Sequence, residues 1–159
     1  MNARICLFLA AVLGFVAVGL GAFGAHGLSD KPYLQNKYAD LPPKTIAGYD
    51  VPASYKYFQD YRTAVRYHMW HALTLLAVGI LLKSSSPKSL RAAAWCFLLG
   101  IVLFSGSLYL LVLAGPRWGG IPWGAVTPVG GTLLLAGWVC LATYAWAQRP
   151  LETATDRPE

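Results

Sequence analysis

The stretch ICLFLAAVLGFVAVGLGAFGAHG, residues 5–27, decides the fold class of this chain. It belongs to a run of 25 residues between Arg4 and Asp30 that contains no charged side chain. An α-helix rises about 1.5 Å per residue, so about 20 apolar residues cross the roughly 30 Å hydrocarbon core of a bilayer. A cleaved signal peptide has a shorter apolar region of about 7–15 residues. The stretch therefore predicts an uncleaved transmembrane helix.

Three further apolar segments follow, and we expect them to span the membrane at about 60–82, 92–114 and 127–148. Arg62 and Arg66 precede the charge-free part of the first of these segments, at the expected level of the lipid headgroups. Thr127 and Pro128 resemble an N-cap followed by the first residue of a helix. The sequence therefore predicts an all-α polytopic membrane protein, a bundle of four transmembrane helices that forms a single membrane domain over residues 1–159.

Two polar segments lie outside these spans. Residues 29–59 are rich in tyrosine and proline, which favours a loop packed at the membrane interface over a disordered linker. Residues 149–159 form a polar tail, expected to be loosely held.

Four spans place both termini on one side of the membrane. The turn at 83–91 has three basic residues and no acidic one, so the positive-inside rule places the termini in the cytoplasm and the protein in the plasma (inner) membrane.

Composition excludes several functional classes. Only 13% of the 159 residues are charged, about half of the ~25% typical of soluble domains, and 56% are hydrophobic. The net charge is +6, but no basic run interleaved with aromatic residues suggests nucleic-acid binding. Cys6, Cys96 and Cys140 lie in apolar runs without a C-x-x-C pair, so neither a disulfide framework nor a thiolate zinc site is expected.

Polar residues within the expected spans are the candidate functional site, and counting residues from the charged ends places them in the same half of the bilayer. This candidate polar intramembrane cluster consists of His26, His68, His71, Ser105, Ser107 and Thr127. A functional interpretation is a ligand pocket, a proton relay, or a metal or haem site. The structural interpretation is hydrogen bonding between helices. No acidic residue lies inside a span and no catalytic constellation is visible, so we expect neither an enzyme nor a bound cofactor.

Small residues at four-residue spacing predict close contact between helices. The candidates for helix packing are Gly21, Gly24, Gly106, Gly130 and Gly131. Close contact at Gly106 predicts that Gly106→Leu abolishes stable expression. Such small residues pack either within one chain or along the interface of a homo-oligomer.

Four sequence motifs resemble the domain-of-unknown-function 423 family of small membrane proteins. They are GAFGAHGL (21–28), TAVRYHMWHAL (63–73), LFSGSLY (103–109) and TPVGG (127–131). The resemblance implies four membrane helices and no established catalytic activity. It also implies that some residues occupy signature positions of the family: His26, His71, Ser105, Gly106, Ser107, Thr127, Pro128, Gly130 and Gly131. His68 stands where the family more often has glutamine, and residues 29–60 are longer than its usual first loop.

Three functional hypotheses follow. The first is a non-enzymatic membrane protein, acting as a subunit, a scaffold or in envelope and lipid physiology. The second is a protein that handles a small ligand, an ion, haem or a metal through the polar cluster. The third and weakest is an intramembrane enzyme with Ser105 or Ser107 as nucleophile beside His71, because nothing in the sequence fixes the orientation of that histidine. The expected partners are the lipid bilayer and either a membrane protein or a second copy of the chain.

Overall fold

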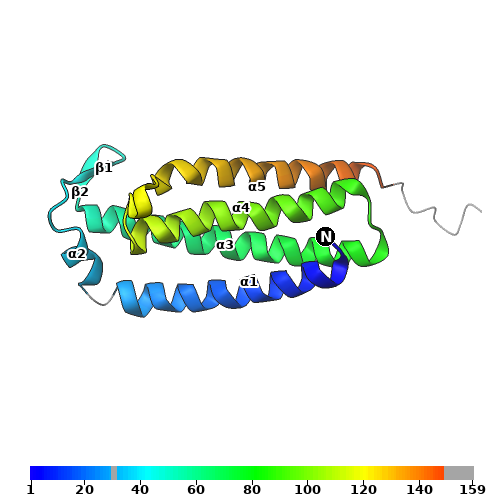
Figure 1. Ribbon diagram of the computed structural model, residues 1–159, viewed down its shortest axis with the longest axis horizontal. Coiled ribbons are helices and arrows are strands. Elements are labelled where there is room, and N and C mark those ends of the chain that lie inside the picture. The colour runs from blue at the N-terminus through cyan, green and yellow to red at the C-terminus, as the bar shows by residue number, and fades with distance from the viewer. Residues whose placement is uncertain (30–31, 149–159) are drawn as a thin grey trace, which may run out of the picture.

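The computed structural model describes residues 1–29 and 32–148, in which four long helices lie side by side (Figure 1). The helices are α1 (Ala3–Phe23), α3 (Ala53–Ser84), α4 (Lys88–Leu113) and α5 (Trp123–Trp146). Each is long and apolar enough to cross a membrane. This confirms the predicted all-α, four-helix membrane fold. The polar tail predicted at 149–159 lies outside the described residues.

Two helices begin before the segments expected to span the membrane. Helix α3 starts at Ala53, directly after Pro52, and so extends about two turns beyond the expected span. Helix α5 starts at Trp123, and Thr127 is not its N-cap but lies inside the helix. The Ala125 N–H already donates to the Pro122 carbonyl at 2.8 Å, which starts the helix before the Thr-Pro pair. Pro128 lies in the second turn, where its ring removes one backbone donor without ending the helix.

The first connection contains short regular elements. Helix α1 passes directly into a π-helical turn, η1 (Gly24–Leu28), and the short helix α2 (Tyr33–Lys37) follows. Strands β1 (Lys44–Ile46) and β2 (Tyr49–Val51) form an antiparallel hairpin. Its two turn residues, Ala47 and Gly48, both have positive φ, as the tightest hairpin turns require. The second outer connection contains the 3₁₀ turn η2 (Trp118–Gly120).

The tyrosine-rich segment is docked on the end of α4. The Tyr38 hydroxyl donates to the carbonyls of Leu111 at 3.1 Å and Val112 at 2.8 Å, and the Lys37 ammonium donates to the Leu113 carbonyl. These carbonyls belong to the last turn of α4, where no intrahelical donor is available and a positive charge is favourable. Burial raises the pKa of Tyr38 above its ordinary value, which keeps the hydroxyl a donor. The segment that follows α1 therefore caps α4, although about 75 residues separate the two in the sequence.

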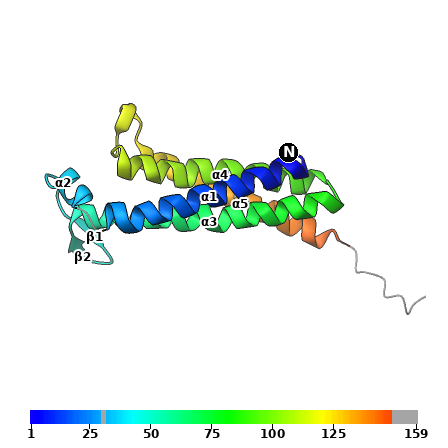
Figure 2. The same cartoon turned by 90° about the horizontal axis from the view of Figure 1, so that it is seen from below.

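Helices α3 and α4 form the middle of the protein. Helix α1 packs on α3, α3 on α4, and α4 on α5, and Figure 1 shows α1 and α5 on opposite sides of α3 and α4. Seen from below in Figure 2, α1 lies in front of α5, between α4 and α3. Of the most apolar part of each helix, 39% is buried in α3 and 44% in α4, whereas only 17% is buried in α1 and in α5. Both outer helices therefore present most of their apolar surface to the surroundings, as membrane helices do.

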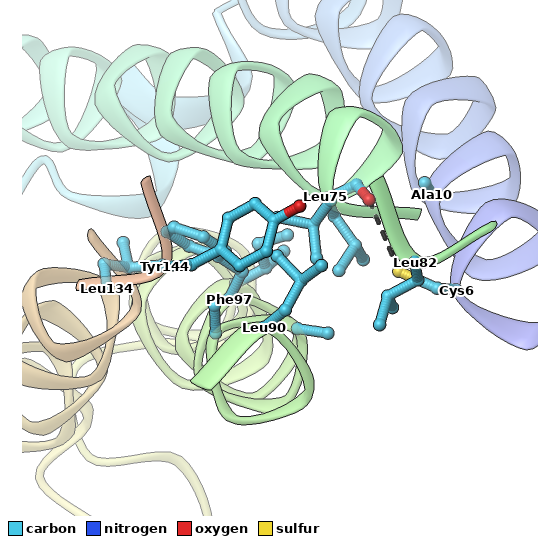
Figure 3. Close-up of a cluster of buried hydrophobic side chains, with 12 residues drawn as sticks. Cys6, Ala10, Leu75, Leu82, Leu90, Phe97, Leu134 and Tyr144 are labelled. Carbon is cyan, nitrogen blue, oxygen red and sulfur yellow. Dashed lines mark hydrogen bonds between the residues drawn. The ribbon is translucent and has the colours of Figure 1, made fainter. Parts of the chain in front are cut away.

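The largest buried cluster joins all four helices near the end of the protein that carries the N-terminus (Figure 3). Phe97 of α4 and Leu75 of α3 are fully buried in it, and Leu134 of α5 packs against them. Cys6 of α1 reaches the same cluster, where its thiol donates to the Leu75 carbonyl at 3.4 Å (Figure 3). The thiols of Cys6, Cys96 and Cys140 are free.

Glycines set the distance between helices at particular points. A Cβ on Gly130 of α5 would lie 2.2 Å from the Phe104 nitrogen of α4, and one on Gly24 would lie 2.7 Å from the Tyr61 ring. Gly21 and Gly131 have only ordinary contacts, at 3.5 and 3.6 Å. The close contact expected at Gly106 is not found, because a Cβ there would meet no atom within 4 Å.

Candidate functional site

His71 joins α3 to α5 across the face of α4. Its Nδ1 lies 2.8 Å from the Tyr67 carbonyl, which can only accept, so Nδ1 carries the proton. Its Nε2 then accepts from the Trp138 indole N–H at 3.3 Å. The ring is buried between Phe97 and Tyr67. Both nitrogens of His71 are therefore engaged, and neither offers a lone pair to a metal.

His68 lies one turn away and contacts α4 instead of α5. Its Nδ1 is 3.3 Å from the Tyr109 hydroxyl, while its Nε2 is buried without a hydrogen-bond partner. Ser105, one turn from Tyr109 on α4, likewise has a buried hydroxyl without a partner. Buried polar atoms of this kind are uncommon in proteins. One buried nitrogen on α3 and one buried hydroxyl on α4 therefore lack a hydrogen-bond partner.

Ser107 and Thr127 form a third polar contact, between α4 and α5. Their hydroxyl oxygens lie 2.8 Å apart, and Ser107 also donates to the Phe104 carbonyl at 3.0 Å. Thr127 additionally contacts the Trp123 carbonyl at 3.4 Å. This pair stands one helical turn from Gly130, where the two backbones approach most closely. Its geometry is that of an interhelical hydrogen bond in a tight seam.

The predicted polar residues are thus divided among three helix contacts. His26 lies in the exposed π-helical turn at the end of α1. Within residues 1–29 and 32–148, no group of three His, Cys, Asp or Glu side chains is placed to hold a metal ion. The nitrogens of His68 and His71 contact a backbone carbonyl, an indole and a phenol. The contacts to the phenol and to the indole join neighbouring helices.

A groove of about 750 Å³ runs between α3 and α5, with Phe104 of α4 at its base. Its walls are mainly apolar and aromatic, and His71 and Trp138 meet in it. The lining residues are Tyr67, Trp70, His71, Leu73, Thr74, Phe104, Pro128, Gly131, Thr132, Leu134, Leu135 and Trp138. The volume lies within the range of ordinary ligand pockets, about 300–1,000 Å³.

Both threonines that line this groove use their hydroxyls within the protein. Thr74 donates to the Trp70 carbonyl at 2.9 Å, and Thr132 donates to the Pro128 carbonyl at 3.0 Å. Each threonine therefore uses its hydroxyl within its own helix. Together with the occupied nitrogens of His71, this leaves a groove suited to hydrocarbon rather than to a charged ligand.

The sequence indicates the histidines but not their partners. Trp138 and Tyr109 lie on other helices, and no spacing rule pairs them with His71 and His68. The π-helical turn at Gly24–Leu28 was also missed, although it coincides with the motif GAFGAHGL. The close spacing of three glycines there is the signal that could have indicated an irregular helix.

Comparisons with known proteins place the chain in a family. The model of the family described as "Protein of unknown function (DUF423)" matches residues 20–131, which include all four motifs quoted above. The chain is 38% identical over 143 residues to the UPF0382 membrane protein YwdK of Bacillus subtilis, covering 89% of this chain and 96% of that protein. It is 34% identical over 145 residues to the UPF0382 inner membrane protein YgdD of Escherichia coli, covering 91% and 92%.

A third relative, a UPF0382 membrane protein of Haemophilus influenzae, is 36% identical over 146 residues, covering 91% of this chain and 96% of its own length. No solved structure matches the chain. The matches span nearly the whole of each relative, and the names of these relatives describe membrane proteins. The chain is therefore an integral membrane protein that belongs to the DUF423 family of proteins of unknown function.

Proposed function

We propose that this protein is a non-enzymatic, lipid-binding protein of the inner membrane, and that it holds the hydrocarbon chain of a membrane lipid between α3 and α5. The observation that carries this proposal is the groove of about 750 Å³ with its apolar and aromatic walls. Pockets between the helices of bundles are common sites for small apolar ligands. The ligand enters from the surrounding bilayer, so the lipid bilayer is the principal partner.

The side-chain chemistry supports binding over catalysis. Both nitrogens of His71 are hydrogen-bonded, so it does not act as a free base in this arrangement. Ser107 is bonded to Thr127 and to a carbonyl, so its hydroxyl is not activated by a histidine. The second hypothesis, a metal or haem site, has less support because both nitrogens of His71, which a metal would need, are already hydrogen-bonded.

Retention of lipid by the purified protein tests this function. Native mass spectrometry of the protein from mild detergent is expected to detect one bound phospholipid or neutral lipid per chain. Gly131→Leu fills the groove from α5, at a position where a Cβ meets only the Phe104 ring at 3.6 Å, and is expected to abolish that retention. Val139→Leu, on an exposed face of α5 outside the groove, is the matched control. Equal retention by the wild type and Gly131→Leu would overturn the proposal.

We further propose that both termini lie in the cytoplasm. The basic turn between α3 and α4 carries Lys83, Lys88 and Arg91, and short basic loops remain on the cytoplasmic side. The name of the Escherichia coli relative, an inner membrane protein, supports the choice of membrane. Fusions of green fluorescent protein and alkaline phosphatase to the C-terminus are expected to give fluorescence and no phosphatase activity, and the opposite pattern would reverse the orientation.

Association with a second copy or with another membrane protein stays a prediction. The outward face of α1 exposes Phe8, Phe15 and Val18, all more than 60% accessible, and a bilayer covers such a face as well as a protein does. Light scattering of the purified protein, corrected for detergent, distinguishes a monomer from an oligomer.

A further inference from the structure

Two arginines lie one turn apart on α3, beside α1. Arg62 and Arg66 are both exposed and both line a hollow of about 300 Å³ between these helices. Counted from Lys83 at about 1.5 Å per residue, Arg66 lies about 26 Å and Arg62 about 32 Å along the helix. A hydrocarbon core is about 30 Å thick, so the two guanidinium groups lie at its far boundary, where lipid headgroups begin.

The wall opposite the arginines is made of small residues. Gly21, Gly24 and Ala25 of α1 and η1 line the hollow on that side. The Tyr61 ring lies against Gly24, and its hydroxyl donates to the Leu20 carbonyl at 2.7 Å. That hydroxyl therefore binds a carbonyl where α1 changes into the π-helical turn. π-Helical turns inside helices occur frequently at functional sites.

Neither arginine is neutralised by a carboxylate in the described part of the chain. The one ion pair found there joins Lys56 to Asp60, one turn earlier on α3. Arg62 lies over the Phe58 ring and Arg66 over the Trp70 ring, each with Cζ 6.0 Å from the ring centroid. Stacking holds a guanidinium group on an aromatic face while its N–H donors remain available. The hollow is thus bordered by two positive charges without an acidic partner.

We propose that Arg62, Arg66 and the small-residue wall of α1 bind the headgroup phosphate of an anionic phospholipid, in the leaflet on the side of the tyrosine-rich connection. The guanidinium groups offer paired N–H donors to phosphate oxygens, and this geometry is the one in which arginine surpasses lysine. The headgroup lies at the hollow and its acyl chains run down the seam between α1 and α3. The hollow shares no lining residue with the groove between α3 and α5, so this site does not depend on the proposed function.

Binding of labelled lipids in detergent micelles tests the site. The full-length protein is titrated with fluorescent phosphatidylglycerol and, separately, with fluorescent phosphatidylcholine, which has a phosphate but no net charge. We expect a preference for phosphatidylglycerol that Arg62→Gln/Arg66→Gln reduces by about tenfold or more, since each basic residue near a membrane surface contributes about 1 kcal/mol toward anionic lipid. Arg62→Lys/Arg66→Lys retains the charge and is expected to restore only part of the preference.

Three comparisons decide the outcome. Lys88→Gln/Arg91→Gln removes the same charge from exposed positions at the other end of the protein, and is expected to leave the preference unchanged. Ala25→Leu narrows the hollow while both arginines remain, and is expected to weaken binding. An unchanged preference in Arg62→Gln/Arg66→Gln, or an equal loss in the two glutamine variants, would overturn the proposal. If the first variant does not fold, full binding by Ala25→Leu overturns it.

Gly131→Leu separates this site from the other groove. We expect this variant to keep the preference for phosphatidylglycerol while it loses the lipid retained between α3 and α5. Loss of both properties in Gly131→Leu would show that one lipid site serves both, and would overturn the separate arginine site.

Discussion

The seam between α4 and α5 and the seam between α1 and α3 are both built around glycine, but they meet different atoms. In the first, a Cβ on Gly130 would meet the backbone of Leu103 and Phe104, which cannot move without moving α4. In the second, a Cβ on Gly24 would meet the Tyr61 ring, and one on Gly79 would meet mainly the Leu7 side chain. Side chains can change rotamer and backbones cannot. At Gly130 the seam between α4 and α5 therefore has less room to adapt than the seam between α1 and α3 has at Gly24 and Gly79.

The two proposed lipid sites depend on these seams in different ways. The groove between α3 and α5 depends on α5 being held apart from α3, and the backbone contact at Gly130 fixes α5 against α4 instead. The hollow beside Arg62 and Arg66 lies on the adaptable seam, where a headgroup can be accommodated by small movements of α1. Substitutions in each seam test this difference.

The largest effect is expected for Gly130→Ala. Its methyl group would lie 2.2 Å from the Phe104 nitrogen, so α4 and α5 must separate. Overpacking of this kind costs about 1–3 kcal/mol, and more where backbone must shift. We expect a lower thermal unfolding temperature in detergent and loss of lipid retention between α3 and α5. Gly131→Ala is the neighbouring control, and an unfolding temperature for Gly130→Ala as high as that of the control would disprove the close backbone contact at Gly130.

A smaller effect is expected for Gly24→Ala. Its methyl group would lie 2.7 Å from a carbon of the Tyr61 ring, which must rotate and weaken its bond to the Leu20 carbonyl. We expect a loss of about 1–2 kcal/mol in the free energy of unfolding, measured by denaturant titration in mixed micelles. Tyr61→Leu should remove most of this clash, so the double variant is expected to be less destabilised than the sum of the single variants. Simple additivity would contradict the contact.

Tyr38→Phe probes the cap on α4 and is expected to cost about 1 kcal/mol, because two carbonyls lose their donor. Tyr49, which is 76% exposed, provides the control substitution Tyr49→Phe.

Since burial raises the pKa of Tyr38, the folded state favours the neutral hydroxyl. Its contribution is therefore complete below the ordinary pKa of about 10 and falls as the pH rises above it. A wild-type advantage over Tyr38→Phe that did not shrink in alkaline titration would contradict this assignment.

The smallest effect is expected for Gly106→Ala. No atom lies within 4 Å of its Cβ position, and alanine favours a helix by up to about 1 kcal/mol over glycine. We expect unfolding at the same or a slightly higher temperature, measured by circular dichroism. A destabilisation as large as that of Gly130→Ala would place Gly106 in a close contact and remove the distinction between the two faces of α4.

The sequence alone predicts the number of spans, because four apolar segments are each long enough to cross a bilayer. The run between Arg4 and Asp30 and the three later segments needed no tertiary information. The ends of the helices were less predictable. Helix α3 extends to Ala53 through charged residues, and hydropathy carries no signal for a helix that continues into water.

Only the tertiary structure decided which polar and small residues meet. His71 and Trp138 are 67 positions apart, and Gly130 rather than Gly106 lies where two backbones touch. A period of 3.6 residues places a residue on a face of its helix, but the neighbour of that face depends on how the four helices are rotated and ordered. In a membrane, every face of a span is apolar, so hydrophobicity does not indicate which face is inside. Packing of small residues and a few hydrogen bonds make that choice, and both require the partner helix to be present.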